Sequence, residues 1–263
     1  MAGKLRGLLV GALCGVAVTL ERAGTVCIYA AAGLMRRETL ERHICGDWHQ
    51  FGVRQSEREI ASGLFDWERE FFAPFLKAGD AILVVGCGSG RDLIALRQLG
   101  YQADGLDPVP ECVALTRERL AKLGLGADVY TDRIETLALP RRFDVFMFSW
   151  FCYGYIPRRR TRIEILRKVK EHLLSDGRIL ISYIPCDPPP RPILARLARL
   201  VARLSGSDWR PEDRDFFLAR HDAPLVHYEH RFFPDEIEAE AREAGLRVAF
   251  HARPVDGTLV LTA

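Results

Sequence analysis

The chain has 263 residues, of which 48% are hydrophobic and 27% are charged, and its formal net charge at pH 7 is +2. This length accommodates one α/β domain with additions, and the near-neutral charge gives no electrostatic argument for binding nucleic acid. The seven cysteines include no C-x-x-C pair, so we expect no metal site and no disulfide framework. Free thiols fit a reducing, cytoplasmic location.

The N-terminal residues 1–44 are expected to form an apolar helical segment. Leu8 to Leu20 and Ala23 to Met35 are apolar, and Glu21-Arg22 separate them. Each half would be about 20 Å long as a helix, which is too short to cross a bilayer alone. Three interpretations stay open: a helix packed on the domain or on a partner subunit, as in a homodimer; a membrane-surface or re-entrant anchor; and a cleaved signal peptide.

A strand, a glycine turn and a helix follow one another from residue 81. Ala81 to Val85 is a bare apolar run, as in a strand buried on both faces, and Asp92 to Leu99 has helical spacing. Between them, Gly86 to Gly90 read G-x-G-x-G. Glycines let the backbone approach a ligand, and the helix start offers free N–H groups to an anion. A dinucleotide-binding loop would need its last glycine at Arg91, and an ordinary tight turn remains the alternative.

A second short strand, Tyr101 to Asp107, ends in an acid that can accept hydrogen bonds from both hydroxyls of a ribose. Together the G-x-G-x-G loop and this acid resemble the cofactor motifs of the class I S-adenosylmethionine (SAM)-dependent methyltransferases. The resemblance implies a Rossmann-like fold and SAM as the cofactor. It also implies these cofactor contacts: Gly86, Cys87, Gly88, Gly90, Asp107 and Pro108.

Two later segments extend the resemblance. Asp132 follows a third strand, residues 127–131, at the position where the family accepts a hydrogen bond from the adenine amino group, and Arg133 and Ile134 would flank the ring. The fourth strand, from Phe143 to Ser149, begins with Phe-Asp-Val as in the family, which places Ser149 beside the methionine part of SAM.

The residues after Ser149 bear on the acceptor. Enzymes that methylate exocyclic amines of bases carry a D/N-P-P-Y/F box here, and Ser-Trp-Phe-Cys stands in its place, which argues against base methylation. Tyr153 and Tyr155 are expected to face the acceptor pocket, with core packing as the alternative. Because family members often fold the segment before the glycine loop over the site, we also expect lid residues there: His49, Gln50 and Arg54.

The rest of the chain completes the predicted architecture. We expect a core at 45–184, a helical insertion at 185–224 and a C-terminal helix with a hairpin at 225–263. The predicted fold is α/β: a seven-stranded, mostly parallel, doubly wound sheet with a C-terminal antiparallel hairpin. The insertion contains an amphipathic helix, residues 191–204, whose arginines favour a lid or a phospholipid surface.

The predicted function is transfer of a methyl group from SAM to an oxygen or nitrogen of a small molecule, with a lipophilic acceptor favoured by the apolar N-terminus. The candidate catalytic residues are His230, Tyr153 and His227. Two alternatives remain: a thiol-dependent methyltransferase for metalloids such as arsenite, using Cys45, Cys152 and Cys186, and a SAM-binding scaffold without activity. The expected partners are the acceptor and, through residues 1–36 and helix 191–204, a membrane surface.

Overall fold

The computed structural model describes residues 2–139, 141–186, 191–220, 223–253 and 257–263. The chain divides into two compact units, which are described separately. Unit 1 comprises Met1–His43 with Pro190–Tyr228, and unit 2 comprises Ile44–Pro189 with Glu229–Ala263. The apolar N-terminal segment and most of the expected insertion therefore belong to one unit. Residues 187–190 and 221–222 of that insertion lie outside the described residues.

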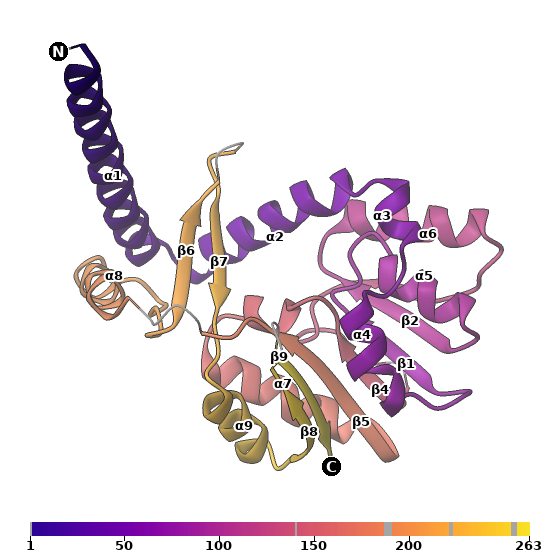
Figure 1. Ribbon diagram of the computed structural model, residues 1–263. Helices are drawn as coiled ribbons and strands as arrows, with labels where there is room; N and C mark the ends of the chain where they lie inside the picture. Colours follow the sequence, from indigo (N-terminus) through magenta and orange to yellow (C-terminus); the bar gives the residue numbers. More distant parts are fainter. Residues whose placement is uncertain (1, 140, 187–190, 221–222, 254–256) are drawn as a thin grey trace. The chain divides into compact units, whose positions relative to one another are not determined.

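Unit 2 is built on a seven-stranded sheet with the strand order β3-β2-β1-β4-β5-β9-β8 (Figure 1). Strands β1 to β5 are parallel to one another, and β9 is antiparallel to both β5 and β8. This confirms the predicted mostly parallel sheet with a C-terminal antiparallel hairpin. Its strands are β1 (Ala81–Val85), β2 (Gln102–Asp107), β3 (Val129–Thr131), β4 (Phe143–Phe148), β5 (Leu173–Tyr183), β8 (Arg247–Ala252) and β9 (Gly257–Thr262).

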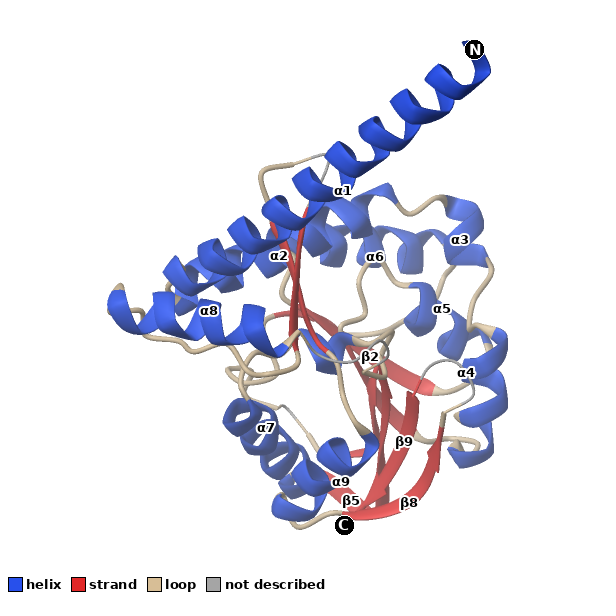
Figure 2. Ribbon diagram, turned by 60° about the vertical axis from the view of Figure 1, so that its left-hand side comes forward, coloured by secondary structure: helices blue, strands red, loops and turns tan. Residues whose placement is uncertain are grey.

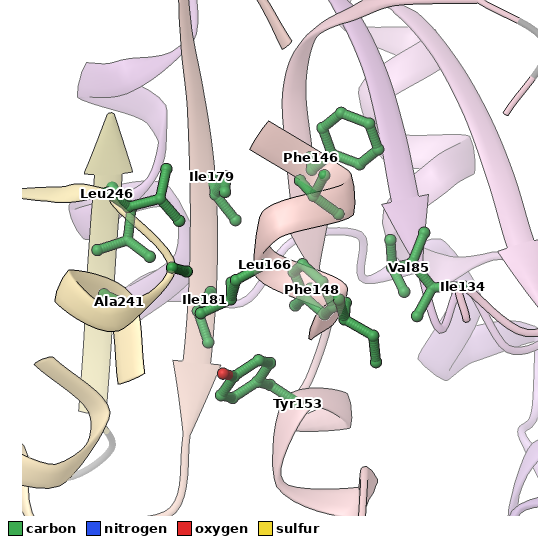
Figure 3. Packing of buried hydrophobic residues seen from close by; sticks show 14 of the residues in the cluster. Val85, Ile134, Phe146, Phe148, Tyr153, Leu166, Ile179, Ile181, Ala241 and Leu246 are labelled. Atoms are coloured by element: carbon green, nitrogen blue, oxygen red, sulfur yellow. The ribbon is translucent and has the colours of Figure 1, made fainter. Parts of the chain in front are cut away.

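Helices cover both faces of this sheet, which is why its central strands are apolar throughout. Alternate residues of β1 enter different cores: Leu83 and Val85 join the core under α7 and α9, while Ile82 and Val84 join the core under α5 and α6. Figure 3 shows the first of these cores. The helices of unit 2 are α3 (Glu57–Ala61), α4 (Asp66–Phe71), η1 (Ala73–Phe75), α5 (Arg91–Gln98), α6 (Pro110–Lys122), η2 (Cys152–Tyr155), α7 (Arg159–Glu171) and α9 (Pro234–Glu243).

A fully buried ion pair joins α7 to α9. Arg162 and Glu240 are both 0% exposed, and the Arg162 Nη2 lies 2.7 Å from Glu240 Oε1. The hydroxyl of Tyr153 donates to the other carboxylate oxygen at 2.9 Å, and Arg162 also donates to the Ile156 carbonyl at 3.2 Å. Because each buried charge has several partners, the pair fixes how the two helices pack.

From residue 37 to β1 the chain forms one long helix followed by three short helical pieces. Residues Arg37–Arg54 form one continuous helix, α2, in which the chain passes from unit 1 to unit 2. Between α2 and β1 the chain forms three short helical pieces, α3, α4 and η1. Gly63 adopts φ +67° between the first two, a conformation that ends a helix readily only with glycine.

Unit 1 consists of α1 (Ala2–Leu34), the start of α2, α8 (Pro192–Leu204) and a two-stranded hairpin. The hairpin is formed by β6 (Asp215–Ala219) and β7 (Val226–His230). The last two residues of β7, Glu229 and His230, belong to unit 2. The two apolar halves of the N-terminus form a single helix, and α8 packs along its C-terminal part (Figure 2). The helix expected in the insertion is present, but the hairpin that follows it was not expected. Its strands are five residues each, near the lower limit at which alternation can be recognised.

Candidate functional site

The glycine loop leaves β1 at the carboxyl edge of the sheet and turns into α5. Gly86, Gly88 and Gly90 all adopt positive φ, at 74°, 52° and 102°. A Cβ at Gly86 would lie 2.8 Å from the Cβ of Cys152, so a side chain there would collide with the next loop. A Cβ at Gly88 would meet nothing within 4 Å, because this residue borders an open cavity. The loop therefore presents bare backbone to that cavity.

Side chains of α6 hold the glycine loop from behind. The hydroxyl of Thr116 donates to the Gly88 carbonyl at 2.8 Å, and Arg119 donates to the Ser89 carbonyl at 2.8 Å. Ser89 in turn donates from its hydroxyl to the Gly52 carbonyl of α2 at 2.9 Å. These contacts fix the loop, so a ligand would not have to order it.

Asp107 lies at the end of β2, directly beside this loop. Its Oδ2 accepts from the Gly88 N–H at 2.8 Å, and its Oδ1 accepts from the Val109 N–H at 2.9 Å. Burial raises the pKa of Asp107, and the two backbone donors act against that rise. Asp107 and Pro108 both line the cavity. Each carboxylate oxygen of Asp107 can accept a further hydrogen bond, because a carboxylate oxygen has more than one lone pair.

The loop after β3 brings Asp132, Arg133 and Ile134 to the same cavity. The Asp132 Oδ1 accepts from the Arg133 N–H at 2.7 Å and from the Thr136 hydroxyl at 2.5 Å, and the Thr136 bond is the main cause of a lowered Asp132 pKa. Lys168 of α7 donates to three carbonyls of this loop, at Ile134, Glu135 and Leu137, within 2.6–3.0 Å. The loop is thus held in place from the protein side.

A buried charged cluster lies at the start of α5. Arg91 pairs with both oxygens of Glu68, at 2.8 and 2.9 Å, and with Asp92 at 2.5 Å, and its guanidinium stacks on the Phe65 ring. The hydroxyl of Ser149 donates to the Asp92 carboxyl, and Arg91, Asp92 and Ser149 line the cavity. Burial, followed by the charge of Glu68, raises the pKa of Asp92 to about 8. The sequence analysis did not single out Arg91 or Asp92 as site residues.

The cavity extends from the glycine loop to a wall of aromatic side chains. Trp48 meets Tyr155 edge to face with ring centroids 4.5 Å apart, and Phe51 meets Trp150 in the same way at 4.8 Å. One face of α2 supplies much of this wall. Its lining residues recur at helical spacing: Ile44, Cys45, Trp48, Phe51 and Gly52, with Gln55 just beyond the helix.

The residues of α2 that were expected to form a lid do not line the cavity: His49, Gln50 and Arg54 are absent from its walls. Their neighbours on the adjacent helical face are the ones that do. The signal was present in the sequence, since Ile44, Trp48, Phe51 and Gln55 recur every three or four residues.

The structure brings all ten predicted cofactor contacts except Gly90 to the cavity wall, but it does not bring the three catalytic candidates there. Tyr153 is 0% exposed and donates to Glu240 in the core, whereas Tyr155, two residues on, reaches the cavity. His230 is 1% exposed, lies 3.2 Å from Glu236 and packs on Phe232. His227 is a half-buried residue of β7 in unit 1.

Four cysteines line the cavity: Cys45, Cys87, Cys112 and Cys152. Burial raises the pKa of the Cys87 and Cys152 thiols well above their ordinary value and that of Cys112 to about 12. The Cys152 thiol donates to the Val85 carbonyl at 3.1 Å. These three thiols are therefore protonated at neutral pH and act as neutral packing groups.

Comparison with known proteins agrees with this geometry. A family model described as a methyltransferase domain matches residues 82–177. A ubiquinone biosynthesis O-methyltransferase of Xanthomonas euvesicatoria pv. vesicatoria is 25% identical over 173 residues, which are 65% of this chain and 64% of that protein. The match thus spans less than two thirds of the relative's length.

Solved structures show the same fold. A SAM-dependent methyltransferase from Methanosarcina mazei has a TM-score of 0.59 and 17% identity, covering 76% of this chain and 97% of that one. The CcbJ methyltransferase from Streptomyces caelestis has a TM-score of 0.59 and 15% identity, covering 81% and 95%. The glycopeptide N-methyltransferase MtfA, solved with SAM, has a TM-score of 0.54 and 17% identity, covering 74% and 86%. The sheet order, the loop after β1 and these matches show that the chain contains a methyltransferase domain with the fold of the class I SAM-dependent methyltransferases, and the neighbours solved with SAM support SAM as the cofactor.

Proposed function

We propose that this methyltransferase transfers the SAM methyl group to an oxygen or nitrogen of a small, lipophilic molecule. The observation that carries the proposal is one continuous cavity with two different ends: bare glycine backbone and carboxylates at one, and aromatic rings at the other. The relatives point the same way, since one is named for O-methylation in ubiquinone biosynthesis and another for N-methylation of a glycopeptide.

The polar end of the cavity fits the cofactor. Gly88 has no Cβ where a nucleoside would lie against the backbone, and the Asp107 carboxylate beside it would accept from the ribose hydroxyls. Asp132 would accept from the adenine amino group, with Ile134 against the ring face. We assign the methionine end to Asp92 and Ser149, because both line the cavity and the SAM ammonium group would favour the charged form of a carboxyl whose pKa burial has raised despite its pairing with Arg91.

The aromatic end would align the acceptor. SAM supplies a methyl group already activated on a sulfonium, so the protein's task is to hold a nucleophile in line with the C–S bond and to exclude water. Trp48, Trp150 and Tyr155 offer π faces and edges to an apolar acceptor, and such rings also favour a nearby positive charge. Among the described residues, no histidine lines this cavity, which favours an acceptor that is nucleophilic without a histidine base.

The burial of Cys152, one of the three cysteines on which the metalloid alternative rests, does not favour that alternative. Binding of trivalent arsenic needs thiolates, and the raised pKa values of Cys87, Cys112 and Cys152 hold these thiols protonated. The cysteines of the described chain are all free, which fits the reducing cytoplasm in which we place the catalytic unit.

The Asp92 assignment predicts a pH-dependent affinity. S-adenosylhomocysteine (SAH) carries the same ammonium group as SAM, so it should lower the Asp92 pKa from about 8 and release a proton on binding. Below pH 8 Asp92 is mostly protonated, and binding must first remove this proton, which costs affinity. We therefore expect SAH affinity to rise roughly tenfold between pH 6.5 and 8.5. Calorimetry in buffers of different ionisation enthalpy measures the proton directly. Asp92→Asn should remove the pH dependence, and an equal slope in this variant would refute the assignment.

Incubation with isotope-labelled SAM tests the reaction itself. With total lipid extract as the acceptor source, we expect label in an organic-soluble product, and an aqueous extract freed of lipid should give little. Trp48→Ala should slow transfer by raising the KM for the acceptor, because it removes part of the aromatic wall. The control is Tyr153→Phe. Tyr153 is also an aromatic residue near the cavity in sequence, but its hydroxyl donates to Glu240 in the core, so turnover should be unchanged. SAH binding without labelled product in either extract would instead indicate a scaffold.

A further inference from the structure

We propose that unit 1 is a membrane anchor in which α1 inserts into a bilayer containing anionic phospholipid and α8 lies on the bilayer surface. This goes beyond the proposed reaction and rests only on unit 1. Its evidence is the distribution of apolar and basic side chains over α1 and α8.

The N-terminal part of α1 is apolar on all sides, and no residue that the structure describes covers it. Residues 6–24 are exposed at every position, and Leu8, Leu9 and Val10 are 73%, 56% and 59% exposed although they are consecutive. Consecutive helix positions point about 100° apart, so no single partner face could cover them. By length and composition alone the stretch Arg6–Leu34 could cross a membrane, but only its exposed N-terminal part is available for insertion.

The C-terminal third of the same helix is built into unit 1. Tyr29 and Ala32 are 1% and 0% exposed, the Trp209 indole donates to the Ala32 carbonyl at 3.1 Å, and the Tyr29 hydroxyl donates to the Asp215 carbonyl at 3.3 Å. Cleavage after a signal peptide would remove a part of this small core. We therefore infer that the helix is retained in the mature protein.

Helix α8 buries its small residues and exposes its large ones. Ala195, Ala198 and Ala202 are at most 1% exposed, and a Cβ at Gly33 of α1 would collide with the Ala198 carbonyl, which shows how closely the two helices approach. On the opposite face, Ile193, Leu200 and Leu204 are 78%, 54% and 78% exposed. A face of large apolar side chains directed away from the protein is typical of a helix that lies in a membrane interface.

The charges of unit 1 favour anionic lipid over a second copy of the chain. Unit 1 has 13 Lys and Arg against 8 Asp and Glu, a formal charge of +5, whereas the rest of the chain has 24 against 27, or −3. Arg196 and Arg203 flank the exposed face of α8. Two such faces meeting in a dimer would repel each other, but anionic headgroups would be attracted to them. Gly7–Leu20, about 21 Å of helix, would lie in the hydrocarbon, with Glu21 and Arg22 near the headgroups on the side of unit 1.

Flotation of the full-length protein with vesicles tests the proposal. We expect the wild type to float with vesicles of phosphatidylcholine and phosphatidylglycerol, to bind pure phosphatidylcholine at least tenfold less, and to resist an alkaline carbonate wash. Leu13→Glu with Val16→Glu should abolish wash-resistant binding. Leu200→Glu with Leu204→Glu should weaken binding to the anionic vesicles while leaving α1 in place.

The matched control is Leu99→Glu with Leu123→Glu, which changes two exposed leucines of unit 2 and should float like the wild type. SAH affinity, measured on the same proteins, reports on the catalytic unit separately. The proposal is overturned if the wild type stays with the soluble fraction, if the α1 and α8 variants float unchanged, or if the membrane-bound protein has lost residues 1–36 by intact mass. A vesicle-independent dimer that these substitutions dissociate would show that a second copy covers the apolar surface.

Discussion

Replacing Asp107 with alanine is expected to weaken SAH binding by roughly a hundredfold, because two hydrogen bonds to a charged acceptor contribute together about 3 kcal/mol or more. The carboxylate is 7% exposed and lies at the cavity edge with Gly88 and Val109 as its backbone donors. Asp107→Asn should lose less affinity, since the amide oxygen can still accept from one hydroxyl. Isothermal titration calorimetry with SAH measures both variants.

Two controls keep this experiment specific. Glu118→Ala removes an exposed carboxylate of α6 and should bind SAH like the wild type. Thermal unfolding followed by circular dichroism should show that Asp107→Ala is still folded. The Gly88 and Val109 N–H groups lose their acceptor in this variant, but they can donate to water in the open cavity instead. Unchanged SAH affinity in a folded Asp107→Ala protein would remove the ribose from this position and with it the proposed orientation of the cofactor.

Replacing Arg162 with methionine is expected to lower the free energy of unfolding by about 3–5 kcal/mol, because it leaves the Glu240 charge buried without its main partner. Urea denaturation measures the change. Arg160→Met is the matched control on the same helix. Arg160 is 85% exposed and, among the described residues, pairs with Glu164 one turn away, so we expect a change within about 0.5 kcal/mol.

The double variant Arg162→Met, Glu240→Met separates the pair from the packing around it. Removing both charges removes the unpaired carboxylate, so the double variant should be more stable than Arg162→Met alone. If the single and double variants are equally destabilised, the loss comes from side-chain packing and not from the unpaired charge.

The parts of the fold and site that the sequence predicted are those set by local rules. The strand before Gly86, the positive-φ glycines and the acid at the end of β2 are each specified within a few residues, and the structure has them at one edge of the sheet. The roles of Asp107, Asp132 and Ser149 toward the cofactor remain predictions that the binding experiments address.

The residues on the acceptor side of the cavity could not be predicted in the same way. Their directions depend on backbone dihedral angles, which the spacing of apolar residues in the sequence does not reveal. Trp150 and Phe151 adopt positive φ, at 31° and 63°, immediately before the short helix η2. After these two residues, Tyr155 reaches the cavity while Tyr153 lies in the core and donates to Glu240. The buried partners of Tyr153 and His230 lie far along the chain or on another element, so their sequence neighbours gave no indication of burial.

The way α1 divides between exposed and buried parts has a practical consequence for preparing the protein. A version that begins near residue 25 would lack the exposed apolar turns of α1. It would keep Tyr29 and Ala32, whose carbonyl accepts from the Trp209 indole. A version that begins at residue 37 would lack all of α1 and would expose the alanine face of α8. It would therefore remove the exposed apolar surface of α1 but create a new one on α8. Shortening the chain for solubility therefore has a natural limit before Thr25.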